Sequence, residues 1–209
     1  MRLAHGVVIF PGGAGTAEEI FYLLGVLLDP RNAEQQLPVV LTGPEASAPY
    51  FQQLLRFIAG AVSPEAAAKF TLITGSPADV ARHLVAAMSR VRGFRRASND
   101  SYNFNWLLHV PEALQHPFAV THDSMRGLAL HRDQPPHERV ANIRRAFSGI
   151  VAGNVKAQGI AAIEREGPFE LCGDAQLMSM MDELLRGFAA AGRMKLPGAA
   201  YVPCYRIVC

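Results

Sequence analysis

Cysteine is scarce in this chain. Its 209 residues include only Cys172, Cys204 and Cys209. Three cysteines cannot all pair within one chain, and their spacing matches no zinc-binding pattern, which argues against a disulfide framework and against a metal site. We therefore expect reduced thiols in a cytoplasmic protein, with no metal and no other cofactor.

A strong charge of one sign and a long apolar run are also missing. The chain has 20 basic and 18 acidic residues and a formal net charge of +2, which argues against a large nucleic-acid surface. The longest apolar runs, such as Phe21 to Leu28, are too short to span a bilayer, and the first residues do not resemble a signal peptide. We expect a globular protein of one or two domains that binds neither nucleic acid nor membranes.

Lysine is nearly absent, because the basic residues comprise 17 arginines and 3 lysines. The planar guanidinium group of arginine suits phosphate recognition. A composition bias of the genome explains the same excess equally well. The arginine content alone therefore does not indicate a phosphate ligand.

The most informative segment is residues 10–19, Phe-Pro-Gly-Gly-Ala-Gly-Thr-Ala-Glu-Glu. The apolar, β-branched run from Gly6 to Phe10 predicts a buried strand before it. Apolar residues at helical spacing predict a helix after it, which stops at Asp29 and Pro30. The segment is therefore a glycine-rich turn between a strand and a helix.

Such a turn can hold an anion. Its glycines allow positive φ and the close approach of a ligand, and the free amides and dipole of the following helix attract negative charge. We predict that Gly12, Gly13, Gly15 and Thr16 bind phosphate. The spacing differs from that of the ATP-type P-loop and of the dinucleotide fingerprint, so neither of those sites is supported.

The two glutamates after the turn also have a structural interpretation. Thr16 and Glu19 have the spacing of a capping box, and Glu18 complements the helix dipole. From spacing alone, the structural interpretation of Glu18 and Glu19 is favoured over a catalytic one.

The first part of the chain alternates strands with helices. Residues 37–42 and 70–74 predict two further strands, with helices around 49–61 and from Pro77 onward. This pattern is typical of α/β proteins and predicts the C-terminal half of a Rossmann-like, doubly wound parallel sheet, in which ligands bind at the carboxyl ends of the strands. Thr42 and Gly43 are then expected to face one pocket with the glycine turn and to bind substrate.

The rest of the chain has a different composition. A basic segment at residues 91–96 predicts a linker. We therefore divide the chain into a nucleotide-binding region at 1–92, an aromatic-rich linking segment at 93–136, and a mostly helical C-terminal domain with a terminal strand at 137–209. Tyr102, Phe104 and Trp106 alternate with polar residues, a pattern that fits a base-stacking face but more often a core strand.

The motif Pro-Gly-Gly-x-Gly-Thr-x-x-Glu at residues 11–19 resembles the signature of the LOG family, nucleotide-binding proteins long mislabelled as lysine decarboxylases. Segments at residues 101–106, 146–156 and 193–198 are similar to the bacterial pyrimidine/purine nucleotide 5′-monophosphate nucleosidases. This resemblance runs over the whole chain. Members of that family are considerably longer, so we expect this chain to be a C-terminal portion.

The resemblance implies a nucleoside 5′-monophosphate such as AMP as substrate and hydrolysis of its N-glycosidic bond. It implies that Glu19 stabilises positive charge on the ribose C1′ and activates water, with Glu18 as a second candidate. It also implies a homo-oligomer and, in full-length members, a guanosine alarmone effector. The family's arginine partner precedes the motif strand, and that role is not transferred to Arg2.

Two other functions remain open. A carrier of a nucleotide or cofactor can use the same fold, as the molybdenum-cofactor carrier proteins do, although the two glutamates and the C-terminal resemblance disfavour it. An amino-acid decarboxylase would need a lysine for pyridoxal phosphate. Lys69, Lys156 and Lys195 are the only lysines, and none lies in the phosphate motif.

Overall fold

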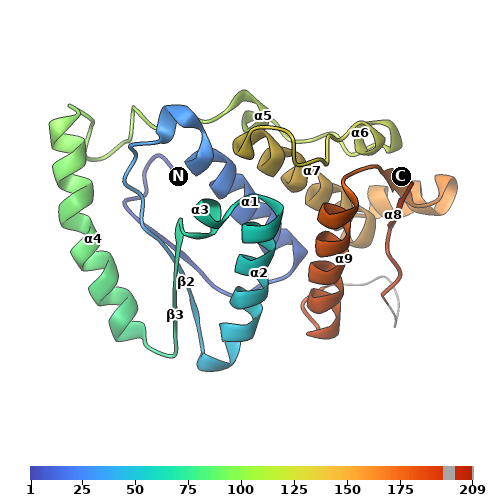
Figure 1. The fold of residues 1–209 in the computed structure, drawn as a ribbon, viewed down its shortest axis with the longest axis horizontal. Coiled ribbons are helices and arrows are strands. Elements are labelled where there is room, and N and C mark those ends of the chain that lie inside the picture. The colour runs from blue at the N-terminus through green and yellow to red at the C-terminus, as the bar shows by residue number, and fades with distance from the viewer. Residues whose placement is uncertain (195–200, 209) are drawn as a thin grey trace.

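The computed structural model describes residues 1–194 and 201–208. Its main sheet has three parallel strands in the order β1-β2-β3 (Figure 1). β2 is paired along both edges, whereas β1 is paired only with β2 among the described residues. The predicted α/β fold with a partial parallel sheet is confirmed. The strand bounds are Val7–Ile9 for β1, Val39–Gly43 for β2 and Phe70–Thr74 for β3.

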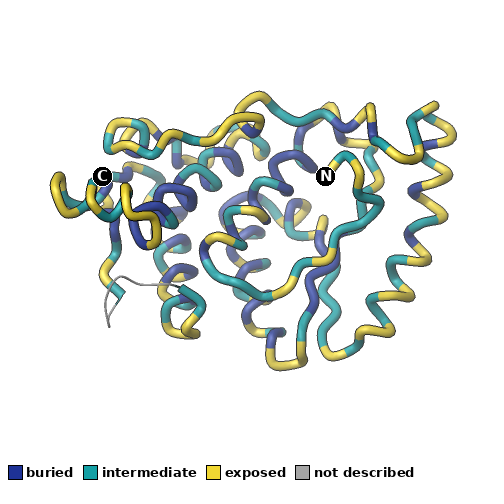
Figure 2. Tube along the Cα trace, turned by 180° about the vertical axis from the view of Figure 1, so that it is seen from behind, coloured by how far each residue is buried: buried dark blue, intermediate teal, exposed yellow. Residues whose placement is uncertain are grey.

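Helices lie on both faces of this sheet (Figure 1). α1 (Ala14–Leu28) and α2 (Ala48–Ala61) lie on one side, and α4 (Pro77–Ala97) lies on the other. Most of α4 is exposed or half-buried, which Figure 2 shows from behind. Short helical turns connect these elements: η1 (Pro30–Asn32), η2 (Glu45–Ser47) and α3 (Pro64–Ala67).

The second half of the chain packs against α1 and α2, on the side away from the sheet (Figure 1). α7 lies along α1, and α9 lies against α2. β4 and β5 form a separate parallel pair. The bounds are Glu112–Gln115 for α5, His122–Arg126 for α6, Pro136–Val155 for α7, Ala157–Glu166 for α8, Phe169–Leu171 for β4, Ala175–Ala190 for α9 and Tyr205–Ile207 for β5.

Aromatic rings join the two halves into one hydrophobic core. The ring centre of Phe21 in α1 is 4.9 Å from that of Phe147 in α7. The ring centre of Tyr50 in α2 is 5.5 Å from that of Phe188 in α9. Because α1 and α2 bury apolar residues toward the sheet and also toward α7 and α9, they form a middle layer. The helix that carries the glycine turn is therefore held from both sides.

The segment 91–96 is not a linker, which corrects the sequence-based interpretation. α4 continues through it to Ala97. Arg95 is buried, donates a hydrogen bond of 2.9 Å to the carbonyl of Tyr102 and lies 3.9 Å from the Asp100 carboxylate. Arg95 holds the end of α4 to the segment that follows. From sequence, the basic residues here indicated a solvated linker. The division into three regions remains a prediction, and its first boundary falls inside α4.

The aromatic segment after α4 is not a core strand. No strand spans residues 101–106, and Tyr102 and Trp106 are exposed. The rings of Phe104 and Trp106 lie 4.8 Å apart between their centres. Their alternation with polar residues therefore reflects an irregular, partly exposed segment.

Several other expectations about the second half hold. The region at 137–209, expected to be mostly helical, contains α8, α9 and nearly all of α7. Asp174 caps α9 by accepting hydrogen bonds from the Gln176 and Leu177 amides. The terminal strand is confirmed at β5. The sequence predicts this strand over Ala200 to Val208. Residue 200 lies outside the described residues, and within 201–208 only Tyr205–Ile207 forms a strand.

The cysteines do not all behave as expected. Cys204 is a free, buried thiol, and burial raises its pKa to about 12. Cys172 is disulfide-bonded, so the expectation of reduced thiols is wrong for that residue.

Within residues 1–194 and 201–208, no group of three or more His, Cys, Asp or Glu side chains is placed to hold a metal ion. Over the same residues, no helix has both the length and the apolar character needed to cross a membrane.

Arg139 joins α7 to the end of α2 and to the loop before α7. This buried guanidinium donates hydrogen bonds to the carbonyls of Ala61 and Val62, at 3.1 and 3.0 Å, and to those of Arg132 and Gln134. Arg139→Met leaves these carbonyls without a donor, so we expect the free energy of unfolding to fall by about 3 kcal/mol.

Urea denaturation followed by circular dichroism measures this loss. The matched control is Arg165→Met, which removes an exposed arginine paired with Glu166 and is expected to cost less than about 1 kcal/mol. Equal unfolding midpoints for the two variants would show that the Arg139 hydrogen bonds do not hold α7 in place.

Candidate active site at the glycine turn

The glycine turn connects the carboxyl end of β1 to α1, as predicted. α1 begins at Ala14 with Gly13 as its N-cap. The amides of Ala14, Gly15 and Thr16 are in the first turn, where no preceding helical carbonyl is available to them. These donors and the helix dipole favour an anion at this end of α1.

The glycines serve close packing rather than unusual backbone angles. Positive φ is found at other glycines, not at 12, 13 or 15, which corrects the expectation. A β-carbon on Gly12 would lie 2.0 Å from the Thr16 hydroxyl oxygen, and one on Gly13 would lie 1.8 Å from the carbonyl oxygen of Arg193. Any side chain at either position would collide with these atoms, so glycine is required there.

The capping-box interpretation of Thr16 and Glu19 is wrong. α1 begins earlier than that interpretation requires, so Thr16 is its third residue and both glutamates follow the first turn. The N-cap residue is Gly13, which has no side chain that could accept a hydrogen bond from the helix. Because neither glutamate caps the helix, capping does not account for their presence.

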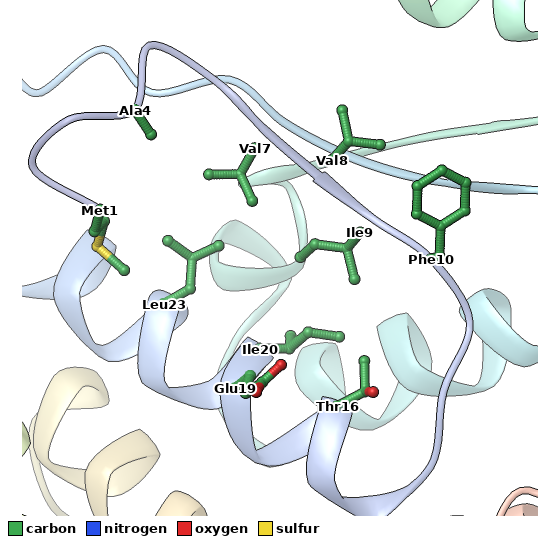
Figure 3. A pocket seen from close by; sticks show the side chains of 10 residues that line it. All are labelled: Met1, Ala4, Val7, Val8, Ile9, Phe10, Thr16, Glu19, Ile20 and Leu23. Carbon is green, nitrogen blue, oxygen red and sulfur yellow. The ribbon is translucent and has the colours of Figure 1, made fainter.

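Glu19 faces a cavity of about 450 Å³ along the edge of β1 that no described strand pairs with. Figure 3 shows the side chains of Thr16 and Glu19 on the same face of α1, directed toward this space. The remaining walls are largely apolar and include Val7, Ile9 and Leu23. Glu19 is the only acidic residue among the described lining residues, so its carboxylate supplies their negative charge.

Glu18 lies on a different face of α1 and contacts α7. Its carboxylate is 3.4 Å from Nη2 of Arg144, and both side chains are mostly buried. The Arg144 guanidinium also lies 5.9 Å from the ring centre of Tyr22. Glu18 is not in the lining of the Glu19 cavity, so the two adjacent glutamates have different surroundings.

Thr42 and Gly43 line a second cavity, of about 450 Å³, together with Pro44, Gly75 and other residues. The turn and the end of β2 do come together, because a β-carbon on Gly43 would lie 3.1 Å from Pro11. The Glu19 cavity and this one are distinct but share Val8 and Phe10 in their walls. The expected single pocket is therefore divided in two around the end of β1.

The sequence does not identify the partner of Arg144, because helix packing brings it to Glu18. The sequence also does not show which part of the fold residues 193–198 contact. Arg193 lies against Gly13 and lines a third cavity, of about 220 Å³, with Gly15 and part of α7. Arg2, the only arginine before the motif, lies 5.8 Å from the ring centre of Phe104 and is not in the lining of the Glu19 cavity.

Comparison with known proteins connects this geometry with a family. Residues 88–208 match the family model described as pyrimidine/purine nucleotide monophosphate nucleosidase, C-terminal. The chain belongs to this family. Residues 1–84, which contain the glycine turn, match a second model, described as possible lysine decarboxylase.

Curated relatives agree with this assignment. Proteins named pyrimidine/purine nucleotide 5′-monophosphate nucleosidase from Escherichia coli strain K12 and from Escherichia coli O157:H7 are each 50% identical to this chain over 207 residues. The match covers 99% of this chain and 46% of each relative. The chain therefore spans about half the length of the curated relatives it matches.

Proposed function

We propose that this chain provides the phosphate-binding turn and the catalytic carboxylate of an enzyme that hydrolyses the N-glycosidic bond of nucleoside 5′-monophosphates, AMP among them. The products are the free base and ribose 5-phosphate. The observation that carries this proposal is the position of Glu19, which faces a cavity beside the amides at the start of α1. In this proposal the phosphate and the reaction centre would lie at one end of one helix.

The 5′-phosphate would be bound by the turn itself. The amides of Gly12, Gly13, Gly15 and Thr16 supply donors, and the positive end of the α1 dipole adds to the attraction. Gly12 packs against the Thr16 side chain and Gly13 against the Arg193 carbonyl, and neither glycine has a side chain of its own to cover the amides. A phosphate held there fixes the position of the attached ribose.

The reaction would then depend on Glu19. As the bond between C1′ and the base breaks, its electron pair goes to the base nitrogen, which takes up a proton, and positive charge develops on C1′ and the ring oxygen. A carboxylate beside C1′ stabilises that charge. Glu19 also accepts one proton of the water whose oxygen forms the new bond to C1′. When Glu19 releases that proton, the net result is that one water has supplied the hydroxyl on C1′ and the proton on the base.

Glu18 is better explained as a structural residue than as a substitute for Glu19. Its contact with Arg144 joins α1 to α7 and leaves it outside the Glu19 cavity. The proposal therefore assigns the carboxylate chemistry to Glu19 alone. Thr42 and Gly43 are proposed to contact substrate from the neighbouring cavity.

The resemblance predicts further properties of the whole enzyme. The resemblance predicts that the whole enzyme forms a homo-oligomer and responds to a guanosine alarmone. It also predicts an arginine that would act beside Glu19. These properties concern more of the protein than this chain spans, and they remain predictions.

The alternatives are less consistent with the structure. Lys69 and Lys156 are exposed, and neither lines the cavities at the glycine turn. Lys195 lies outside the described residues. A pyridoxal phosphate enzyme would need a lysine at its phosphate site. A non-catalytic carrier of the same fold would bind nucleotide without needing an acidic group in the adjoining cavity.

A comparison of AMP with adenosine tests the proposal. A chain extended to the full length of the relatives is incubated with each compound, and release of adenine is followed by chromatography. We expect adenine from AMP at least 100-fold faster than from adenosine, because phosphate binding positions the ribose. Recovery of bound, unhydrolysed AMP would instead support a carrier.

A further inference from the structure

The end of α9 directs the chain toward the glycine turn. Gly192 has a φ of +63°, a left-handed conformation that ends the helix. The amide of Gly192 then donates to the carbonyl of Ala189 at 3.0 Å, and that of Arg193 donates to the carbonyl of Phe188 at 2.8 Å. This turn reverses the chain immediately before Arg193.

Arg193 consequently reaches the turn with little freedom of position. Its carbonyl oxygen occupies the space where a β-carbon of Gly13 would be, at 1.8 Å from that point. Phe188, one turn of helix earlier, is buried and packs on Tyr50 of α2. The two contacts hold the start of the segment after α9 against the first residues of the phosphate motif.

The Arg193 side chain extends over Tyr50, with its guanidinium carbon 5.1 Å from the ring centre. No Asp or Glu carboxylate among the described residues lies within 4 Å of this guanidinium. Arg193 therefore brings a positive charge to the glycine turn without an acidic partner. A buried or half-buried cation of this kind favours a nearby anion.

The Tyr50 hydroxyl is a second unused group at this place. Tyr50 is only 8% exposed, and its hydroxyl is buried without a hydrogen-bond partner among the described residues. The Gly12 amide is close enough to the hydroxyl to lower its pKa, as is the Arg193 charge, but burial has the larger effect and raises the pKa. At neutral pH it is thus a protonated donor beside the turn.

We propose that Arg193 and the Tyr50 hydroxyl bind the same phosphate monoester as the amides of the glycine turn. Arg193 also lines the cavity of about 220 Å³ between the start of α1 and the end of α7. Tyr50 is not in that lining, and none of the described lining residues is acidic, which suits a dianion. This inference rests on the proposed function, and it adds a binding role for the segment after α9. It also gives a function to the contact between Arg193 and the glycine turn. Arg193 lies in the region matched by the nucleosidase C-terminal model, and the turn lies in the region matched by the second model.

A purely structural role for Arg193 predicts different behaviour. If its guanidinium only stacks on Tyr50, its loss lowers stability and affects all ligands alike. If it binds phosphate, its loss weakens phosphate-bearing ligands selectively. The comparison of ribose 5-phosphate with adenine therefore separates the two roles.

The test uses the chain extended to the full length of the relatives, with calorimetric titration of ribose 5-phosphate and of adenine. Arg193→Gln is expected to weaken ribose 5-phosphate binding at least tenfold, with adenine binding changed less than twofold. Arg193→Lys is expected to recover part of the loss. The matched control is Arg186→Gln, on the exposed side of α9 and paired with Asp182 at 2.6 Å, for which both affinities stay within twofold.

Tyr50→Phe provides an independent variant, since it keeps the ring under Arg193 and removes only the hydroxyl. We expect it to weaken ribose 5-phosphate binding about threefold to tenfold. Unchanged ribose 5-phosphate affinity in Arg193→Gln and Tyr50→Phe would overturn the proposal, as would equal losses for ribose 5-phosphate and adenine.

Kinetics distinguish this proposal from the proposed function. With AMP, Arg193→Gln is expected to raise KM at least tenfold and to change kcat less than threefold. If the unaltered protein releases no adenine but Arg193→Gln still loses ribose 5-phosphate affinity, the hydrolase proposal fails and the phosphate site stands. If the unaltered protein hydrolyses AMP and Arg193→Gln leaves KM unchanged, the phosphate role of Arg193 fails.

Discussion

Glu19→Gln is expected to lower kcat for release of adenine from AMP by about 1,000-fold. The amide has nearly the same size as the carboxylate but carries no negative charge and cannot accept a proton from water. Among the described residues that line this cavity, Glu19 alone is acidic, so none of the others can replace its carboxylate. KM is expected to change little, since the phosphate site is formed by other residues.

The adjacent residue provides the control for this experiment. Glu18→Gln removes the same charge one position away, but its expected effect is on stability, because Glu18 contacts Arg144 of α7. We expect kcat within about tenfold of the unaltered protein. Equal kcat in Glu19→Gln and the unaltered protein, or a larger loss in Glu18→Gln, would assign the chemistry to another group.

The 209-residue chain alone is expected to hydrolyse AMP at least 100-fold more slowly than a chain extended to the length of the relatives. Among the described residues, β1 is paired along one edge only, and the Glu19 cavity opens along the other edge. A substrate there would be held on one side only, and its ribose would not be confined against Glu19. Such an edge is also prone to unspecific pairing with other chains.

Adenine release by the two proteins, at equal molar concentration, measures this difference. Circular dichroism and size-exclusion chromatography check that the shorter chain is folded and soluble, so that unfolding is not mistaken for an incomplete site. Turnover by the shorter chain within about tenfold of the longer one would show that the described residues form a complete site.

The elements of the first half were predictable because their signals are local. The apolar run at 70–74 coincides with β3, and Asp29 and Pro30 end α1 where expected. Each of these depends on the residues of one short segment. The parallel direction of the strands also follows, because a helix between two strands forms a crossover connection.

The features that sequence reasoning missed depend on contacts between distant segments. Gly13 is glycine because of Arg193, at the other end of the chain. Glu18 and Glu19 are neighbours in sequence, but the packing of α7 on one face of α1 separates their roles. The basic residues at the end of α4 resembled a linker because the carbonyl that Arg95 binds cannot be identified from sequence.

The most direct measurement of the central claim is the identity of the products formed from AMP. The chain extended to full length is incubated with AMP, and adenine, ribose 5-phosphate, adenosine and inorganic phosphate are all quantified. Hydrolysis at C1′, with phosphate held at the glycine turn, predicts adenine and ribose 5-phosphate in equal amounts and neither of the other two products. Formation of adenosine and inorganic phosphate, or recovery of all the AMP unchanged, would contradict it.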